Sequence, residues 1–245
     1  MQVEVVGVSR SALDEARFGF RVARVERMTL ELLPRALEFC ARQEVRFLMA
    51  NCRSSERRTV QAMEQQGFEL MDTTVCWERD LTQPLAPFGG ALIRTVRTDE
   101  AETLAAAAAE AFRQYVSHYL ADPRLDPARS AEVYPDWVRR TCLGRDAEND
   151  VMVAEVDGKI ASFILMKLLP DAEAIYPLAG VIPEMRRHNV VRNLSLAVLA
   201  WGRDRGAKRG LAQIQLDNVP MQRAMIQIGF LPRYSFFIFH KWFDR

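Results

Sequence analysis

The 245-residue chain lacks an apolar run of about 18 residues, the length that a membrane-spanning helix needs. Its first ten residues lack the basic and apolar regions of a secretory signal peptide. Its net charge is only +1, with 33 basic against 32 acidic side chains, so no global field draws it to nucleic acid or to an anionic membrane. These absences predict a cytoplasmic protein with no nucleic-acid or membrane partner.

Cysteine is scarce, and its spacing excludes two further classes of protein. The four cysteines form no Cys-x-x-Cys pair and have no histidine at metal-ligand spacing, so neither a disulfide framework nor a zinc site is indicated. We expect reduced, mostly buried thiols and no metal cofactor. What remains is 49% hydrophobic and 27% charged, the composition of a globular protein of one large domain or two small ones.

Residues 82–90, TQPLAPFGG, contain two prolines, two glycines and no charge. Such a stretch between two strand-like runs predicts a linker, with one domain at residues 1–81 and another at residues 91–245. The first domain has an alternating α/β pattern. Its predicted elements are strands near 3–8 and at 18–25, 45–49 and 68–77, and helices at 32–42 and 55–66.

After the linker, the predicted order is β, α, α, β, β, β, α, β, α, β. Five consecutive alanines favour a helix at 100–112, and Asp157-Gly158 favours a type I′ hairpin turn. The other predicted helices are 131–143, 190–205 and 220–228, and the strands are 91–97, 151–155, 160–167, 174–182, 211–216 and 230–243.

An internal similarity links the two parts. QAMEQQGF at 61–68 and RAMIQIGF at 223–230 are identical at five of eight positions. Either the halves arose by duplication, or both segments use the common ending of a helix at a glycine cap.

The second part resembles the GNAT superfamily of acyl-CoA-dependent N-acyltransferases over residues 91–243. The resemblance rests on VIPEMRRHNVVRNL at 181–194, at the entry to a long helix, and on Asn218 just after the next strand. It implies an α/β GNAT fold, with an incomplete GNAT-like N-terminal domain before a complete C-terminal one. It also implies acetyl-CoA or another acyl-CoA as co-substrate.

In that superfamily, a loop of the form Arg/Gln-x-x-Gly-x-Gly/Ala holds the CoA pyrophosphate. A helix N-terminus suits phosphate, because its first N–H groups are unsatisfied and its dipole end is positive. Asn189 and Val191 replace the two small residues here, while the cationic side chains nearby supply extra donors. The residues that the resemblance assigns to CoA are Arg186, Arg187, His188, Asn189, Val190, Val191 and Arg192, with the backbone N–H near Val181 polarising the thioester.

The segment from Asn218 to Phe230 resembles the superfamily motif in which an asparagine contacts the CoA arm and a tyrosine protonates the departing thiolate. Met225 occupies the tyrosine position and cannot donate a proton. Another donor is then needed, and Tyr176 and Tyr234 are the candidates by proximity.

The first part, at residues 14–25 and 62–81, resembles the N-terminal domain of dTDP-fucosamine acetyltransferase and its relatives, which modify the amine of a nucleotide-linked deoxyaminosugar. In these enzymes, a segment like residues 112–140 lies over the acceptor. Its flat aromatic faces suit a sugar ring, its arginine suits phosphate, and its histidine suits a general base. The predicted acceptor-binding residues are Tyr115, His118, Tyr119, Arg124 and Tyr134, with Trp137 as a further aromatic face and His118 as the base.

The predicted function is transfer of an acetyl or other acyl group from CoA to a primary amine of a small molecule, with a nucleotide-linked aminosugar as one acceptor class. Two alternatives stay open: a non-catalytic GNAT-fold binding protein, and an acyltransferase whose donor is an acyl carrier protein gripped by the basic loop. A monomer or a homodimer is compatible with the sequence.

Overall fold

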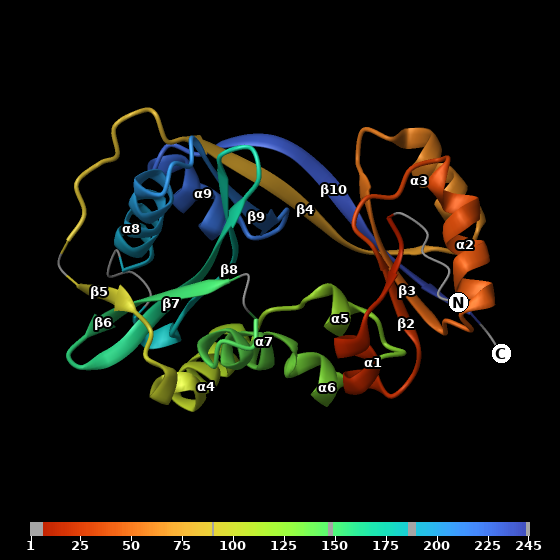
Figure 1. The fold of residues 1–245 in the computed structure, drawn as a ribbon, viewed down its shortest axis with the longest axis horizontal. Helices are drawn as coiled ribbons and strands as arrows, with labels where there is room; N and C mark the ends of the chain where they lie inside the picture. Colours follow the sequence, from red (N-terminus) through yellow and green to blue (C-terminus); the bar gives the residue numbers. More distant parts are fainter. Residues whose placement is uncertain (1–6, 90, 147–148, 186–189, 244–245) are drawn as a thin grey trace. The chain divides into compact units, whose positions relative to one another are not determined.

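The computed structural model describes residues 7–89, 91–146, 149–185 and 190–243 (Figure 1). The chain divides into two compact units. Unit 1 consists of Met1–Val75, Val116–Ser130 and Tyr234–Arg245, and unit 2 of Cys76–Tyr115 and Ala131–Arg233. The division into compact units does not test whether residues 82–90 link two domains, so this linker stays a prediction.

Unit 1 is an α/β unit in which the strand order is β1-β2-β3-β10-β4. β2 and β3 are parallel, and β10 is antiparallel to β3. Its elements are β1 (Ser9–Arg10), α1 (Ala12–Phe18), β2 (Val22–Val25), α2 (Leu32–Arg42), β3 (Phe47–Arg53), α3 (Arg57–Gln65), α5 (His118–Ala121), α6 (Pro127–Ala131) and parts of β4 (Glu69–Asp80) and β10 (Leu231–Trp242).

The two faces of the unit 1 sheet differ. One face packs Ala23, Leu48, Ala50 and Phe239 against helices α2 and α3 in a hydrophobic core. Side chains alternate along a strand, so the residues between these point to the opposite face. The strand register aligns the members of this second face, which carries Arg24, Phe47, Met49, His240 and Trp242.

Helix α1 occupies part of the sequence where we predicted a strand at 18–25. Ser11 caps the helix by accepting a hydrogen bond from the Asp14 N–H, and Gly19 ends it with a φ of 81°. A left-handed residue stops both helix and strand, so β2 begins only at Val22. The prediction of a strand from residue 18 was therefore wrong for its first four residues.

Unit 2 has the strand order β10-β4-β9-β8-β7-β6-β5. Strands β5 to β8 pair antiparallel, and β8 and β9 pair parallel, so the sheet is mixed. Its other elements are β5 (Leu92–Thr95), η1 (Thr98–Glu100), α4 (Ala101–Phe112), α7 (Val133–Cys142), β6 (Asp150–Val156), β7 (Lys159–Leu169), β8 (Glu173–Val181), η2 (Pro183–Met185), α8 (Val190–Asp204), β9 (Arg209–Gln215) and α9 (Val219–Gln227).

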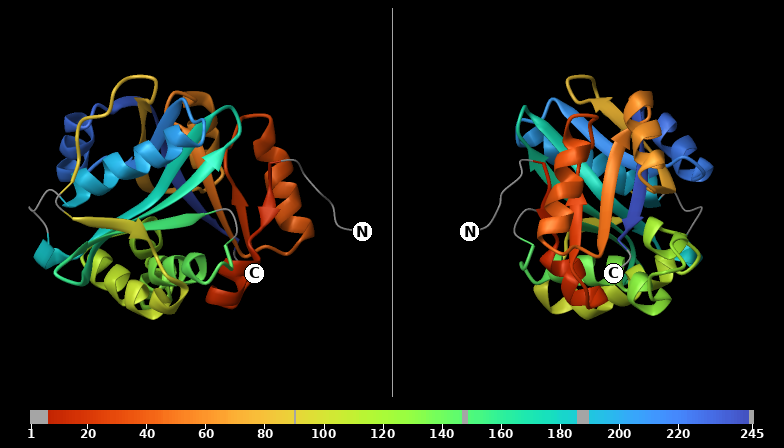
Figure 2. Two further views of the ribbon diagram at one scale, coloured as in Figure 1. Left: turned by 60° about the vertical axis from the view of Figure 1, so that its left-hand side comes forward. Right: turned by 90° about the vertical axis from the view of Figure 1, so that its right-hand side faces the viewer.

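In unit 2, helices α4 and α7 cover one face of strands β6 to β8, and α8 covers the other (Figure 2). The first layer packs Leu104 of α4 and Val138 of α7 against Val153 and Phe163. Strand β7 is buried on both faces over residues 160–166, which explains its unbroken apolar run. The predicted mixed α/β class is confirmed, and all four cysteines are free and buried as expected.

The two similar segments end their helices in the same way. Gly67 and Gly229 have φ values of 75° and 86°. In each case the following phenylalanine N–H donates to a methionine carbonyl five residues earlier, at 3.0 Å. This shared geometry accounts for the sequence similarity locally, and duplication stays a prediction. The Asp157-Gly158 turn also has positive φ at both residues, as a type I′ turn requires.

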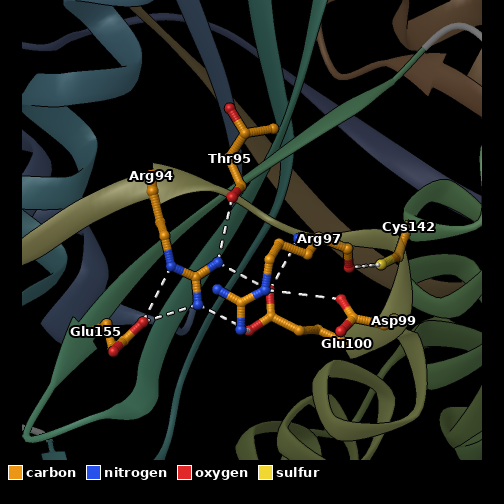
Figure 3. Close-up of polar contacts among 7 residues, drawn as sticks. All are labelled: Arg94, Thr95, Arg97, Asp99, Glu100, Cys142 and Glu155. Atoms are coloured by element: carbon orange, nitrogen blue, oxygen red, sulfur yellow. Dashed lines mark hydrogen bonds and ion pairs between the residues drawn. The ribbon is translucent and has the colours of Figure 1, made fainter.

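A charged cluster joins strand β5 to the short helix η1, just before α4, and to strand β6 (Figure 3). Arg94 donates to both carboxylate oxygens of Glu100, at 2.7 and 2.8 Å, and to Glu155 at 2.7 and 3.0 Å. Arg97 donates to Glu100 as well, at 2.8 Å, and its backbone carbonyl accepts from the Cys142 thiol. These hydrogen bonds, made first by Arg94, lower the pKa of Glu100 from 4.5 to about 2.

An Arg94→Leu variant is expected to lose about 2 kcal/mol of unfolding free energy at pH 7, because two carboxylates lose charged hydrogen bonds. The folded-state pKa of Glu100 lies below its ordinary value, so this contribution is complete above about pH 4.5 and is lost as the pH falls toward 2. Urea denaturation from pH 7 down to about pH 3 should therefore show the difference from the wild type shrinking. A difference that stays constant would contradict the assignment.

Candidate functional site

Strands β8 and β9 separate toward their carboxyl ends. Their parallel pairing covers residues 173–176 of β8 and 209–212 of β9. Both strands continue, β8 to Val181 and β9 to Gln215, and over these described residues they no longer pair with each other. Within the described part of the chain, residues 177–181 of β8 therefore have no ladder partner on β9.

Val181 places one such donor at the opening. The Ile182 N–H donates to the Ala161 carbonyl at 3.0 Å, so these two residues form a hydrogen-bonded pair of the β7–β8 ladder. Val181 lies opposite Ser162, in the adjacent non-hydrogen-bonded pair, and its N–H therefore points away from β7. A carbonyl oxygen held between the separated strands would meet this N–H group.

The predicted pyrophosphate loop is described in part. Helix α8 begins at the buried Val190, with Val191 and Arg192 partly exposed in its first turn. Arg192 donates to the Pro87 carbonyl at 3.4 Å, within the stretch predicted as a linker. Four of the assigned residues lie outside the described part of the chain: Arg186, Arg187, His188 and Asn189.

Asn218 caps helix α9. Its side-chain Oδ1 accepts from the Met221 N–H at 3.2 Å, which leaves the amide nitrogen as the group that can contact a CoA arm. Met225, at the position where the motif has tyrosine, is 5% exposed and lies in the interior. A proton donor for a thiolate must come from another residue.

Tyr176 is held by helix α8. Its hydroxyl donates to the Val198 carbonyl at 3.0 Å, and burial raises its pKa well above the usual value. This bond gives Tyr176 a packing role, and an acid in this position would first have to break it. Its catalytic role stays a prediction.

Tyr234, the other proposed acid, lies on β10 in unit 1 and is partly buried. The guanidinium carbon of Arg53 lies 3.0 Å from its ring centroid. This cation over the ring fixes the orientation of the phenol and stabilises it by a cation–π interaction.

Three predicted acceptor-binding residues come together in unit 1, on segment 116–130. Ser117 caps the short helix α5, and His118 and Tyr119 follow, with ring centroids 4.0 Å apart. Tyr119 is buried, and its hydroxyl accepts a hydrogen bond from Arg24 on β2. Arg124 is more exposed and donates to Glu69 at 2.7 Å.

The other two, Tyr115 and Tyr134, come together in unit 2. Their ring centroids are 5.7 Å apart, and Tyr134 also lies 4.9 Å from Phe112. Trp137 donates its Nε1 proton to Asp146 at 2.9 Å. The aromatic groups of this segment thus fall into two separate sets, each within its own unit.

The sequence reasoning missed three residues of a buried polar network in unit 1: Asp122 within this segment, and His240 and Trp242 on β10. Asp122 has a side chain of 0% exposure and accepts hydrogen bonds from His240 at 2.9 Å and from Trp242 at 2.8 Å. Arg124 Nε donates to its other oxygen at 2.9 Å. His240 Nε2 in turn lies 2.9 Å from His118 Nδ1. The one sequence signal that could have pointed to His240 is the scarcity of histidine, because the chain has only three.

The charge states of this group follow from its surroundings. Burial opposes ionisation of Asp122, but the donors His240, Arg124 and Trp242 outweigh it and hold the pKa of this carboxyl well below its usual range. Burial lowers the pKa of His118, and the neighbouring His240 and Arg24 lower it further. Burial also lowers the pKa of His240, although Asp122 opposes the shift. At neutral pH the carboxylate is charged and both imidazoles are neutral.

A pocket of about 300 Å³ in unit 2 lies beside the Arg94 cluster and is lined by residues 95, 96, 98, 141–144, 146 and 149–151. It contains none of the predicted site residues. In the described ranges, no group of three or more His, Cys, Asp or Glu side chains could hold a metal ion, and no helix is long and apolar enough to cross a membrane.

The separated strands, the helix that begins at Val190 and the capped helix after Asn218 agree with a family assignment from sequence. The sequence model described as the Acetyltransferase (GNAT) family matches residues 104–230, about half of the chain. The chain belongs to this family.

Similarity to particular proteins is more distant. Over 126 residues the chain is 28% identical to the spore coat polysaccharide biosynthesis protein SpsD of Bacillus subtilis (strain 168), a match that covers 51% of this chain and 43% of that protein. Two solved structures resemble its fold, GCN5-related N-acetyltransferases from Sphaerobacter thermophilus and Kribbella flavida. Both have a TM-score of 0.64, with identities of 16% and 15%, and they cover 96% and 98% of this chain and 76% and 89% of their own.

Proposed function

We propose that the protein transfers an acetyl group, or another acyl group, from CoA to the primary amine of a nucleotide-linked aminosugar. The observation that carries the proposal is the opening between β8 and β9, with the Val181 N–H directed into it, in a chain of the acetyltransferase family. The aminosugar is supported by the resemblance of the N-terminal part and by a relative whose name places it in polysaccharide biosynthesis.

On the donor side, the first turn of α8 and the cationic residues from Arg186 to Arg192 hold the pyrophosphate, and the Asn218 amide contacts the CoA arm. A helix N-terminus and charged donors together suit a doubly charged phosphate pair. The thioester supplies the acyl group. The Val181 N–H donates to its carbonyl oxygen and stabilises the negative charge that develops there.

On the acceptor side, Arg124 pairs with phosphate, and Tyr115, Tyr119 and Tyr134 supply aromatic faces. His118, neutral at pH 7, accepts the proton that the amine must lose. Tyr234 and Tyr176 are the proposed donors to the thiolate, and Tyr176 must first break its hydrogen bond to the Val198 carbonyl. Residues 82–90 link the N-terminal domain at 1–81 to the acyltransferase domain at 91–245 in this proposal.

The first experiment is calorimetric titration of the protein with acetyl-CoA and with CoA. We expect saturable binding that weakens about tenfold or more in an Arg186→Ala, Arg187→Ala double variant, because two charged contacts to phosphate are lost. A matched control is the Arg203→Ala, Arg205→Ala double variant at the other end of α8, which removes the same charge and should bind as the wild type does. No binding to either ligand would overturn a free-CoA donor.

The second experiment measures release of the CoA thiol when dTDP-fucosamine is added. We expect turnover on this acceptor and at least about tenfold lower kcat/KM on the free aminosugar, since the nucleotide contributes binding energy. If turnover requires an acylated carrier protein, that protein is the acyl donor in place of CoA. Saturable CoA binding without turnover on any amine would contradict the catalytic proposal.

A further inference from the structure

The second face of the unit 1 sheet carries a line of three linked side chains. Asp122 Oδ2 lies 2.9 Å from His240 Nδ1, and His240 Nε2 lies 2.9 Å from His118 Nδ1. The His240 side chain is fully buried on β10, with the Phe47 ring centroid 4.7 Å from its own in an edge contact. The first and last members, Asp122 and His118, lie in one short segment, four residues apart.

The geometry dictates where each proton is. The ionised Asp122 only accepts hydrogen bonds, so His240 must carry its proton on Nδ1. A neutral His240 then has a lone pair on Nε2, and the proton between the two rings belongs to His118 Nδ1. His118 is left with its lone pair on Nε2.

His118 differs from a histidine that serves packing alone. Both ring nitrogens of His240 are satisfied, whereas among the described residues no donor reaches His118 Nε2. The His118 residue is also partly exposed, while His240 is fully buried. The groups that face the pair are Arg24 on β2, Tyr119 on α5 and Arg124 after it.

We propose that His240 and Asp122 are positioning residues for His118: they hold its ring with Nδ1 protonated and leave Nε2 as the atom that takes the proton from the acceptor amine. This inference rests on the proposed acyl transfer. The N–H bond of the amine breaks, its proton forms a new bond to Nε2, and the electron pair of that bond stays on the amine nitrogen as the lone pair of the nucleophile. The imidazolium keeps its Nδ1–H bond to His240, and water later takes the proton from Nε2.

Asp122 lowers the free-energy cost of protonating His118. Burial disfavours a charged His118, and Arg24 nearby disfavours it further. The carboxylate at the end of the line offsets part of that cost through the polarised His240 ring, as the aspartate of a serine-protease triad does for its histidine. Without His240, the ring of His118 would be free to rotate and to exchange tautomers.

Histidine NMR tests the positioning without any activity. The chain has three histidines, so nitrogen-15 spectra of the rings are simple, and single substitutions assign them. We expect both His118 and His240 as the Nδ1–H tautomer at pH 7. A His240→Phe variant should lose that tautomer at His118, and a His240→Gln variant should keep it, because the amide oxygen can accept from Nδ1–H and the amide nitrogen can donate to Asp122. An Nε2–H tautomer of His118 in the wild type would overturn the inference.

Steady-state kinetics with acetyl-CoA and dTDP-fucosamine test the consequence. We expect His240→Phe to lower kcat about 100-fold, at the lower end of the range for positioned acid–base catalysis, with the KM for acetyl-CoA changed less than about twofold. His240→Gln should recover kcat to within about tenfold of the wild type. Undiminished kcat in His240→Phe would overturn the positioning role alone. Absence of wild-type turnover, with the tautomers intact, would overturn the proposed function and with it the catalytic use of the network.

Discussion

An Asp14→Ala variant is expected to lose about 3 to 5 kcal/mol of unfolding free energy, the range for removing one partner of a buried ion pair. The Asp14 side chain is fully buried in α1. It accepts from Arg24 Nε at 2.8 Å and from Arg17 Nη1 at 3.1 Å, and it also binds the Ser11 hydroxyl. Without the carboxylate, Arg17 and Arg24 both lose the negative charge that compensates their own positive charges. The Arg17 side chain is only 10% exposed, so water replaces that charge poorly.

The matched control is Glu38→Ala. It also removes one acid from a helix, but the pair of Glu38 with Arg42 is more than half exposed at both side chains. Such a pair contributes at most about 0.5 kcal/mol. Urea denaturation of both variants and the wild type at pH 7 measures the contrast. Equal losses in the two variants would show that the Asp14 cluster does not hold unit 1 together.

The effect of Asp14 should reach the proposed base. Arg24 bridges Asp14 and the Tyr119 hydroxyl, and the Tyr119 ring lies against His118. The register of β2 and β3 also puts Arg24 opposite Met49, whose other neighbour across the sheet is His240. The ion pair at the start of the chain and the histidine pair therefore share one face of the sheet.

Local patterns predicted most of the fold. The helix at 32–42 begins and ends at the predicted residues, and strands β5 to β10 lie within two residues of their expected bounds. These elements have strong periodicity, alanine content or turn residues of their own. The short helices α5 and α6 were not predicted, because four or five residues do not form a stable helix alone. Tertiary contacts, such as that of Tyr119 with Arg24, fix the conformation of this segment.

The candidate site was predictable only by residue type. His118 stood out as a titratable group among aromatic residues, and it does lie in a polar network. Its partner His240 is 122 positions away in an alternating strand, where nothing local distinguishes it from a core residue. The same limit applies to Tyr176, since the Val198 carbonyl that it binds lies on a helix packed over its strand. Pairings of this kind are set by sheet register, which short sequence patterns do not specify.

A Gly180→Ala variant is expected to lose about 1 to 3 kcal/mol of unfolding free energy and to impair acyl transfer. A Cβ at residue 180 would lie 2.4 and 2.5 Å from two carbons of the buried Phe163 ring and 3.2 Å from the Ala111 Cβ. Phe163 sits in a packed core, so the strand must move, as overpacked cores generally require. The movement occurs one residue before Val181, and it should misplace the N–H that faces the β8–β9 opening.

A double-mutant cycle separates the steric cause from a general loss of packing. Phe163→Leu alone leaves a cavity, but with Gly180→Ala it makes room for the added methyl group, so the double variant should be at least about 0.5 kcal/mol more stable than the sum of the single losses predicts. Gly210→Ala is the control, because there the Cβ would meet a terminal methyl of Leu199 at 2.6 Å and the Tyr176 ring at 3.2 Å. A leucine end can change rotamer where a phenylalanine ring cannot, so a milder loss is expected. Strict additivity of the two substitutions would contradict the clash. If the double variant recovers stability but not the kcat for acyl transfer, the position of β8, and not the stability of the core, limits the reaction.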